Sequence, residues 1–330
     1  MNRPLRDLRI SVTDRCNFRC VYCMPKEIFG ASYPFIAREE TLSFEEITRL
    51  AGIFARHGVH KLRLTGGEPL VRREIERLIA MLTEVEGIDD IALTTNGSLL
   101  SPKKARALKD AGLQRITISL DSLDDDVFMS MNDVNVPVSK ILTAIDNAVA
   151  VGLEPVKIDM VVKRGLNDQS IVPMARHFKG TGIILRFIEF MDVGTTNGWR
   201  MDDVVSAAEI IERLSQEWAI APAEPNYYGE VAERYKYLDG SGEFGIIASV
   251  TQPFCGTCTR ARLSSDGQLF TCLFGVKGHD FKALLRGGAT DEELSALLKQ
   301  VWGRRADRYS ELRTAGTIPL KKIEMSRIGG

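Results

Sequence analysis

Along the first two thirds of the chain, short strand-like apolar runs alternate with segments whose apolar residues recur at helical spacing. Short runs rich in β-branched residues predict six strands, at residues 8–12, 61–65, 91–95, 115–120, 156–162 and 185–190. Between and after them, apolar residues at helical spacing predict helices over residues 43–56, 74–82, 102–111, 139–149, 168–178 and 207–218. Strands that alternate with helices indicate an α/β fold with a parallel sheet, closed partly into a barrel or open and doubly wound.

The pattern changes near residue 222. Turn signals such as Asp239–Gly242 and Asp266-Gly267 separate short strands, and a last helix is predicted over residues 291–302. We therefore expect two domains, residues 1–221 with the βα units and residues 222–330 as a C-terminal extension of short strands and loops.

Composition bounds the class of protein without naming a partner. The 330 residues suit a barrel of about 200–250 residues plus an extension. Apolar residues make up 44% and charged residues 26%, and the net charge is −1, so bulk charge indicates neither nucleic acid nor a membrane surface. The N-terminal residues lack the apolar run of a signal peptide, and we expect a cytoplasmic protein.

The six cysteines fall into two groups of three. In a large chain without a secretion signal, grouped cysteines favour metal or redox chemistry over disulfides. The first group, Cys16, Cys20 and Cys23, directly follows the first predicted strand. Three close thiolates can hold three irons of a cubane cluster and leave the fourth iron open. A zinc knuckle is the alternative, although structural zinc usually takes four ligands in paired spacing.

The first cysteine group resembles the signature of the radical S-adenosylmethionine superfamily. The resemblance extends over residues 14–25, DRCNFRCVYCMP, and includes an aromatic residue before the third cysteine. It implies a 4Fe-4S cluster whose open iron chelates S-adenosylmethionine, and electron transfer that releases a 5′-deoxyadenosyl radical. The turn Gly66-Gly67-Glu68-Pro69 resembles the superfamily's GGEP motif, although two glycines can also form a simple tight turn.

The superfamily resemblance implies a binding site for S-adenosylmethionine at the carboxyl ends of the strands. Parallel α/β folds place their sites at this edge. The residues implied to contact the cofactor are Tyr22, Gly67, Ser119 and Met191.

The second cysteine group, Cys255, Cys258 and Cys272, lies in the extension. Its surrounding run, CGTCTRAR at residues 255–262, resembles the second-cluster segment of the GTP 3′,8-cyclase family. The resemblance implies a second 4Fe-4S cluster whose open iron contacts guanine, with Arg260 and Arg262 on GTP. Two alternatives stay open: a structural zinc site, and the auxiliary cluster of a peptide-modifying radical enzyme.

Basic residues recur on one face of several predicted strands. Because strand side chains alternate faces, Lys61 and Arg63 share a face, and Arg9 lies on the corresponding face of the first strand. Buried cations are costly without an anion, and a triphosphate would supply one. Alternatively, these cations pair with carboxylates of the lumen or point outward. The family resemblance implies that Arg9, Arg63, Thr94 and Lys157 contact GTP, and that Lys61 and Arg186 lie in the same basic funnel.

The resemblance covers residues 8–330 and implies an incomplete (βα)6 TIM-like barrel, whose extension carries the second cluster. The implied reaction joins C8 of guanine to C3′ of ribose in GTP, as the first step of molybdenum cofactor biosynthesis. Its implied partners are an electron donor and the cyclic pyranopterin monophosphate synthase that receives the product, and the chain would be a monomer or a homodimer. The family also ends in Gly-Gly, so Gly329 and Gly330 are expected to enter the barrel and orient an arginine, for which Arg15 is our candidate.

Overall fold

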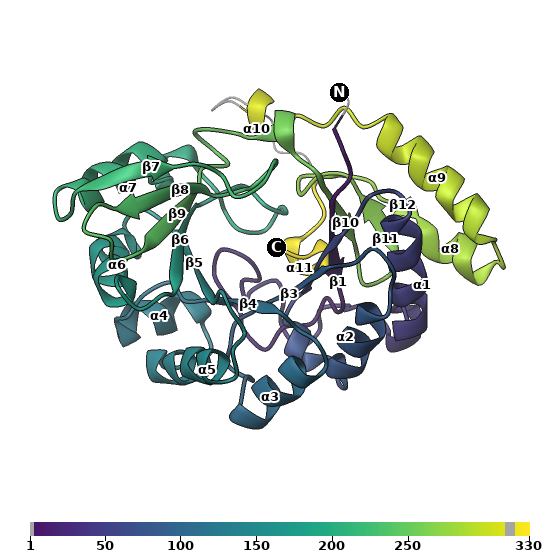
Figure 1. Cartoon of the computed structure of the whole chain (residues 1–330), viewed down its shortest axis with the longest axis horizontal. Helices are drawn as coiled ribbons and strands as arrows, with labels where there is room; N and C mark the ends of the chain where they lie inside the picture. Colours follow the sequence, from purple (N-terminus) through teal and green to yellow (C-terminus); the bar gives the residue numbers. More distant parts are fainter. Residues whose placement is uncertain (1–2, 314–320) are drawn as a thin grey trace.

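A twelve-stranded sheet organises the computed structural model, which describes residues 3–313 and 321–330. The strands are ordered β12-β11-β10-β1-β2-β3-β4-β5-β6-β9-β8-β7. The sheet curves into an arc with most of the helices on its outer side, and the C-terminus lies within the arc (Figure 1). The strand order is linear, so the sheet is not closed, and the expected incomplete barrel is confirmed.

The strands of this sheet alternate with helices up to β6 and then follow one another more closely. The strands are β1 (Asp7–Ser11), β2 (Lys61–Thr65), β3 (Asp90–Thr95), β4 (Arg115–Ser119), β5 (Lys157–Val162), β6 (Ile184–Glu189), β7 (Ile220–Ala223), β8 (Glu233–Tyr237), β9 (Glu243–Ile247), β10 (Arg260–Leu263), β11 (Gln268–Phe270) and β12 (His279–Asp280). The six strands predicted from sequence correspond to β1–β6, with no end shifted by more than one residue.

The longer helices follow the predicted pattern closely. The α-helices are α1 (Phe44–Ala55), α2 (Ile75–Thr83), α3 (Pro102–Asp110), α4 (Asp125–Asn132), α5 (Val138–Ala150), α6 (Ile171–Phe178), α7 (Ala207–Ser215), α8 (Phe281–Arg286), α9 (Asp291–Gly303), α10 (Tyr309–Leu312) and α11 (Met325–Ile328). Short 3-10 helices are η1 (Arg38–Glu40), η2 (Pro69–Val71), η3 (Asp168–Ser170), η4 (Met201–Asp203) and η5 (Cys255–Thr257). The predicted helix over residues 168–178 divides into η3 and α6, and α4, capped by Asp124, was not predicted.

Parallel pairing extends beyond the six predicted strands. β1 to β6 pair in parallel, and two later strands continue the pattern: β10 pairs in parallel with β1, and β9 in parallel with β6. The remaining strands, β7, β8, β11 and β12, join in antiparallel fashion at the two edges. The extension therefore contributes to the same sheet as the βα units. Residue 222 lies within β7, and the domain division proposed there stays a prediction.

The core lies between the sheet and its outer helices. Leu8 and Ile10 of β1 are fully buried in one apolar cluster with Leu50 and Phe54 of α1. Because strand side chains alternate, the intervening Arg9 faces the concave side of the sheet. Among the described residues, no helix is both long enough and apolar enough to cross a bilayer.

The N-terminus of α1 offers a test of local stability. Ser43 and Glu46 form the predicted capping box: the Glu46 amide donates to Ser43 Oγ at 3.1 Å, and the Ser43 amide donates to Glu46 Oε2 at 2.7 Å. Ser43→Ala removes one acceptor for an otherwise unpaired helix amide, and should lower the free energy of unfolding by about 0.5–2 kcal/mol. Urea unfolding followed by circular dichroism measures this, with exposed Ser139→Ala as the control. Equal stability of the two variants would contradict the prediction.

Candidate functional site

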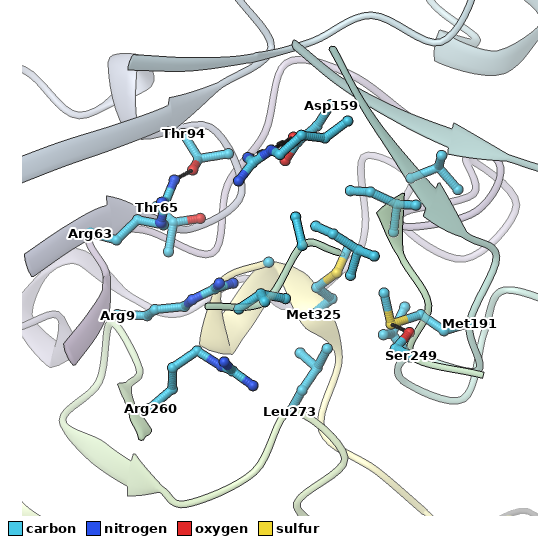
Figure 2. A pocket seen from close by; sticks show the side chains of 18 of the residues that line it. Arg9, Arg63, Thr65, Thr94, Asp159, Met191, Ser249, Arg260, Leu273 and Met325 are labelled. Carbon is cyan, nitrogen blue, oxygen red and sulfur yellow. Dashed lines mark hydrogen bonds and ion pairs between the residues drawn. The ribbon is translucent and has the colours of Figure 1, made fainter. Parts of the chain in front are cut away.

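A cavity with a volume of about 300 Å³ lies on the concave side of the sheet. Its lining comes from the strands β1 to β6, from the extension and from the C-terminal tail, since Met325 and Gly330 both contribute. Figure 2 shows Arg9, Arg63 and Arg260 on one side of this space, and Met191 with Ser249 on another. The predicted site residues therefore converge on one cavity, except Arg15 and Gly329, which are not among its described lining residues.

Strand register places three arginines next to one another across the cavity wall. Arg9 of β1 is the Cα partner of Arg63 on β2 and of Arg262 on β10. Arg63 donates through Nη1 to Thr94 Oγ1 at 3.0 Å and to Thr117 Oγ1 at 3.2 Å. The Nε atoms of Arg9 and Arg63 are buried without a hydrogen-bond partner in the described part of the chain. We call Arg9, Arg63 and Arg262 the arginine row.

Two of the other predicted basic residues do have partners. Arg186 pairs with Asp159, donating from Nε to Oδ1 at 2.7 Å. Lys61 donates to the Tyr227 hydroxyl at 2.8 Å, and its Nζ lies 3.8 Å from Asp90 Oδ2. Pairing with carboxylates, the alternative considered from sequence, thus describes Arg186 and in part Lys61. Lys157 makes no ion pair with any residue that the structure describes.

Positive charge gathers at the arginine row and Lys157, and Asp7 of β1 offsets only part of it. Burial lowers the pKa of Arg9 well below its ordinary value, and the neighbouring Arg262 and Arg63 lower it further. Burial, reinforced by Arg186 and other cations, lowers the pKa of Lys157 to about 7. A group in this position gains a full charge readily when an anion arrives, because the anion offsets both causes.

The first cysteine group is short of positive charge. Cys16, Cys20 and Cys23 all line the cavity. Burial raises the pKa of the Cys16 thiol to about 12, with a smaller contribution from Glu68. Burial also raises the pKa of Cys20 well above its ordinary value, and the thiols of Cys16 and Cys23 add to this. These thiols need a metal cation nearby in order to ionise together.

The second cysteine group lines the same cavity in a more basic setting. Burial raises the pKa of Cys272 to about 11. Burial acts the same way on Cys258, but the guanidiniums of Arg260 and Arg305 outweigh it and bring that pKa to about 7. Cys255 completes the group, and all six cysteines are free thiols.

The three cysteine thiols of each group are suitable ligands for an iron–sulfur cluster, although they are not arranged as a metal site. Within residues 3–313 and 321–330, the structure has no cluster of three or more His, Cys, Asp or Glu side chains arranged to hold a metal. Each group nevertheless supplies three free thiols to one cavity, and thiolates are the ordinary ligands of such clusters.

The residues predicted to bind S-adenosylmethionine all line the cavity. Tyr22 donates from its hydroxyl to Asp121 Oδ2 at 2.8 Å, and the Gly67 amide donates to the Thr13 carbonyl at 2.7 Å. Ser119 ends β4, and Met191 follows β6, where its sulfur accepts a hydrogen bond from Ser249 at 3.2 Å. The tyrosine, glycine and methionine are thus held by contacts within the chain.

Glu68 fixes the turn that follows β2. Its carboxylate accepts from the Leu70 amide at 2.9 Å, from Thr95 Oγ1 at 2.7 Å and from the Asn96 amide at 2.7 Å. Burial raises its pKa to about 7, although these donors favour the charged form. The acidic residue of the GGEP turn therefore ties β2 to the end of β3, rather than pairing with the arginine row.

The C-terminal tail reaches the cavity, whereas Arg15 does not. Arg262 donates from Nη1 to the Gly329 carbonyl, and Gly330 lines the cavity. Gly329 has a φ of +75°, and a Cβ there would collide with the Thr65 side chain, so glycine is required. Arg15 is exposed, lies over the Phe35 ring at 5.2 Å, and is absent from the described residues that line the cavity.

The contacts of two residues at or beside the site, Asp192 and Arg305, were not found from the sequence. Asp192, after β6, accepts from the Tyr309 hydroxyl at 2.5 Å and from Lys322 Nζ at 2.6 Å, which ties the C-terminal segment to the loop that holds Met191. Arg305 donates from Nη2 to Cys258 Sγ at 3.1 Å. None of these contacts has a motif or a period, because each joins segments far apart in the chain.

Comparison with known proteins defines the class. The sequence profile of the radical SAM superfamily matches residues 10–178, and a profile described as Molybdenum Cofactor Synthesis C matches residues 183–311. Streptococcus suis SuiB bound to S-adenosylmethionine is similar in fold, with a TM-score of 0.63 and 15% identity, covering 89% of this chain and 68% of SuiB. Methylornithine synthase (PylB) has a TM-score of 0.52 and 19% identity, covering 64% and 62%. Fold and site together define a radical SAM enzyme, a class that uses S-adenosylmethionine and an iron–sulfur cluster.

Full-length relatives narrow the class further. A GTP 3′,8-cyclase of Acidothermus cellulolyticus is 51% identical, covering 100% of this chain and 98% of the relative. GTP 3′,8-cyclases of Staphylococcus saprophyticus and Staphylococcus aureus are each 52% identical with the same coverage. The chain belongs to the GTP 3′,8-cyclase family.

The turn after β2 gives a testable prediction. A Cβ on Gly67 would collide with the Arg15 carbonyl, next to Cys16, whereas a Cβ on Gly52 of α1 meets only Val85 Cγ1 at 3.9 Å. Gly67→Ala should displace the cysteine loop and reduce the iron bound after anaerobic reconstitution by about half, because the loop would no longer bring its three thiols to one cluster. Gly52→Ala should bind as much iron as the unsubstituted chain. Normal iron content in Gly67→Ala would show that the loop tolerates the collision.

Proposed function

We propose that the chain converts GTP and S-adenosylmethionine into (8S)-3′,8-cyclo-7,8-dihydroguanosine 5′-triphosphate, the first step of molybdenum cofactor biosynthesis. The observation that supports the proposal in this chain's own residues is the arginine row, none of whose guanidiniums forms an ion pair with a described carboxylate, in a cavity that also contains both cysteine groups. A nucleoside triphosphate offers the anionic oxygens that arginine forks bind well.

The proposal assigns a 4Fe-4S cluster to each cysteine group. Cys16, Cys20 and Cys23 would hold the first, and Cys255, Cys258 and Cys272 the second. When bound, the first cluster and S-adenosylmethionine supply a 5′-deoxyadenosyl radical that removes the 3′ hydrogen of GTP. The chain positions both molecules and excludes other hydrogen donors, while the cofactor supplies the difficult chemistry.

The S-adenosylmethionine site would lie at the carboxyl ends of the strands. Tyr22 is fixed by Asp121, so its backbone can lie beside the adenine without moving. Gly67 keeps the backbone of the turn close to the cysteine loop, where a side chain would not fit. Ser119 and Met191 would complete the site, and Ser249 orients the methionine sulfur.

The GTP site would extend from the arginine row toward the second cysteine group. Arg9, Arg63 and Lys157 would bind the triphosphate, with Lys61 and Arg186 adding positive charge behind them. Thr94 accepts a hydrogen bond from Arg63 and would present this arginine to the substrate. Arg260 and Arg262 would contact GTP near Cys255, Cys258 and Cys272, which would hold the second cluster.

The proposal gives the tail a catalytic role. Gly329 and Gly330 would orient Arg262, which already donates to the Gly329 carbonyl, while Arg15 would have to leave the Phe35 ring to act in the reaction. An electron donor, transfer of the product to cyclic pyranopterin monophosphate synthase, a cytoplasmic location, and a monomeric or homodimeric state complete the proposal. A peptide-modifying radical enzyme has no comparable need for the arginine row.

Anaerobic turnover tests the function directly. The reconstituted chain, reduced and supplied with GTP and S-adenosylmethionine, should bind about eight irons and form 5′-deoxyadenosine with a cyclised nucleotide. Cys20→Ala should halve the iron and abolish cleavage of S-adenosylmethionine. Cys258→Ala should also halve the iron yet leave some uncoupled cleavage. Full cleavage by the Cys20 variant, or no cyclised nucleotide from the unsubstituted chain, would refute the assignment.

The low pKa of Lys157 predicts how GTP affinity depends on pH. Free Lys157 titrates near pH 7, and a bound triphosphate raises its pKa, so binding takes up a proton. Affinity should fall as pH rises above 7, by up to about tenfold per unit. Lys157→Arg stays charged and should lack this fall.

Isothermal titration calorimetry of both forms between pH 6.5 and 9 measures the effect. Ionisation of the nucleotide is common to the two, so only the difference between them reports Lys157. Parallel pH profiles would show that this lysine does not titrate on binding.

A further inference from the structure

Arg305 lies directly against the second cysteine group. It follows α9, and its guanidinium reaches Cys258 twice: Nη1 donates to the carbonyl at 2.8 Å, and Nη2 donates to Sγ at 3.1 Å. Its side chain is only 3% exposed. A buried cation therefore donates a hydrogen bond to a sulfur that the proposed second cluster would use.

The surroundings of Arg305 hold the guanidinium in one orientation. Nε donates to Asp307 Oδ2 at 3.0 Å, and the guanidinium lies over the Trp302 ring at 4.5 Å. Trp302 is itself fixed, because its indole nitrogen donates to the Arg3 carbonyl at 2.8 Å. Three kinds of contact thus restrict the arginine, so its bond to the sulfur is a fixed feature of the site.

Charge in this region is positive on balance. Arg3 is also buried, and it donates to the carbonyls of Cys255 at 2.8 Å and Asp307 at 3.0 Å. Arg260 adds a third cation near Cys258. Among the described residues, three carboxylates offset part of this charge: Asp307 faces Arg3 and Arg305, Asp7 is the Cα partner of Arg260, and Glu311 accepts from the Gly256 amide and pairs with Arg308. The surplus positive charge favours a negatively charged group at the cysteines.

We propose that Arg305 is a positioning residue that raises the midpoint potential of the second cluster. The inference rests on the proposed function, since it requires that cluster. Reduction adds one electron, and a fixed cation that donates to a ligating sulfur stabilises the more negative, reduced form. Charge and hydrogen bonds to sulfur are among the factors that set iron–sulfur potentials. The same contacts would keep Cys258 in place for the cluster.

A redox titration of the second cluster alone tests this role. The full chain carrying Cys20→Ala is reconstituted anaerobically, so that the remaining iron reports the second group, and is titrated with electron paramagnetic resonance detection. Adding Arg305→Gln should lower the ratio of reduced to oxidised cluster at a given potential about tenfold. This corresponds to a midpoint potential lower by about 59 mV for one electron. Arg305→Lys keeps the charge and should shift the potential less. The matched control is Arg304→Gln, which removes the exposed neighbouring arginine and should leave the potential unchanged.

Iron content separates the outcomes. About four irons in every variant, with a lower potential only when Arg305 is replaced, supports the role. An unchanged potential in Arg305→Gln overturns it, as does loss of iron from both Arg305 variants, because Arg305 would then only hold the segment together. No iron in Cys20→Ala itself would overturn the second cluster and, with it, the role of Arg305.

Discussion

The parallel pairing of β10 with β1 is the constraint on which the rest of the site depends. It places a strand from the extension beside the first strand of the chain, in a register that aligns Arg262 with Arg9. Cys258 precedes β10 by two residues and Cys272 follows β11 by two, so the same pairing brings the second cysteine group to the cavity. A shift of one residue would turn Arg262 to the opposite face and separate the arginine row.

The site contains two kinds of buried group that need partners of opposite charge: cysteine thiols and arginine guanidiniums. Buried thiols need cations in order to ionise, and buried guanidiniums need anions in order to stay fully charged. The chain meets these needs only in part: Arg260 and Arg305 lie near Cys258 and Asp7 near the arginine row, whereas Glu68 is held by backbone amides and Asp159 by Arg186. Binding partners of both signs would relieve both costs.

Local sequence patterns were sufficient for the parts of the fold that depend on local periods. Alternation in β2 showed that Lys61 and Arg63 share a face, and the Ser43 and Glu46 spacing located the start of α1. Family resemblance, rather than periodicity, pointed to Arg262 and to the tail glycines. The register of β10 on β1 joins residues about 250 positions apart, and no local pattern encodes such a pairing.

The contacts that sequence analysis missed share a physical cause. Arg305 reaches Cys258 because α9 ends close to the second cysteine group, and Asp192 contacts Lys322 because the tail returns past the end of β6. Both are side-chain contacts between irregular segments, whose course depends on the packing of the whole chain. Arg15 was chosen for its position beside Cys16, but its exposed side chain lies over Phe35. Neighbours in sequence need not point into the same cavity.

The strands that flank the six βα strands affect how the chain folds during synthesis. Both flanks of the six-stranded core, at β1 and at β6, are covered by strands that follow it in sequence, β10 and β9. During synthesis, before β9 and β10 are made, the outer edges of β1 and β6 have no pairing strand. Such unpaired edges are templates for association between chains. β1 pairs with β10, which begins at Arg260, so folding must bring together segments far apart in the sequence. Folding should therefore be slow. Fragments that stop before β10 would keep an exposed edge permanently, which makes aggregation their expected fate.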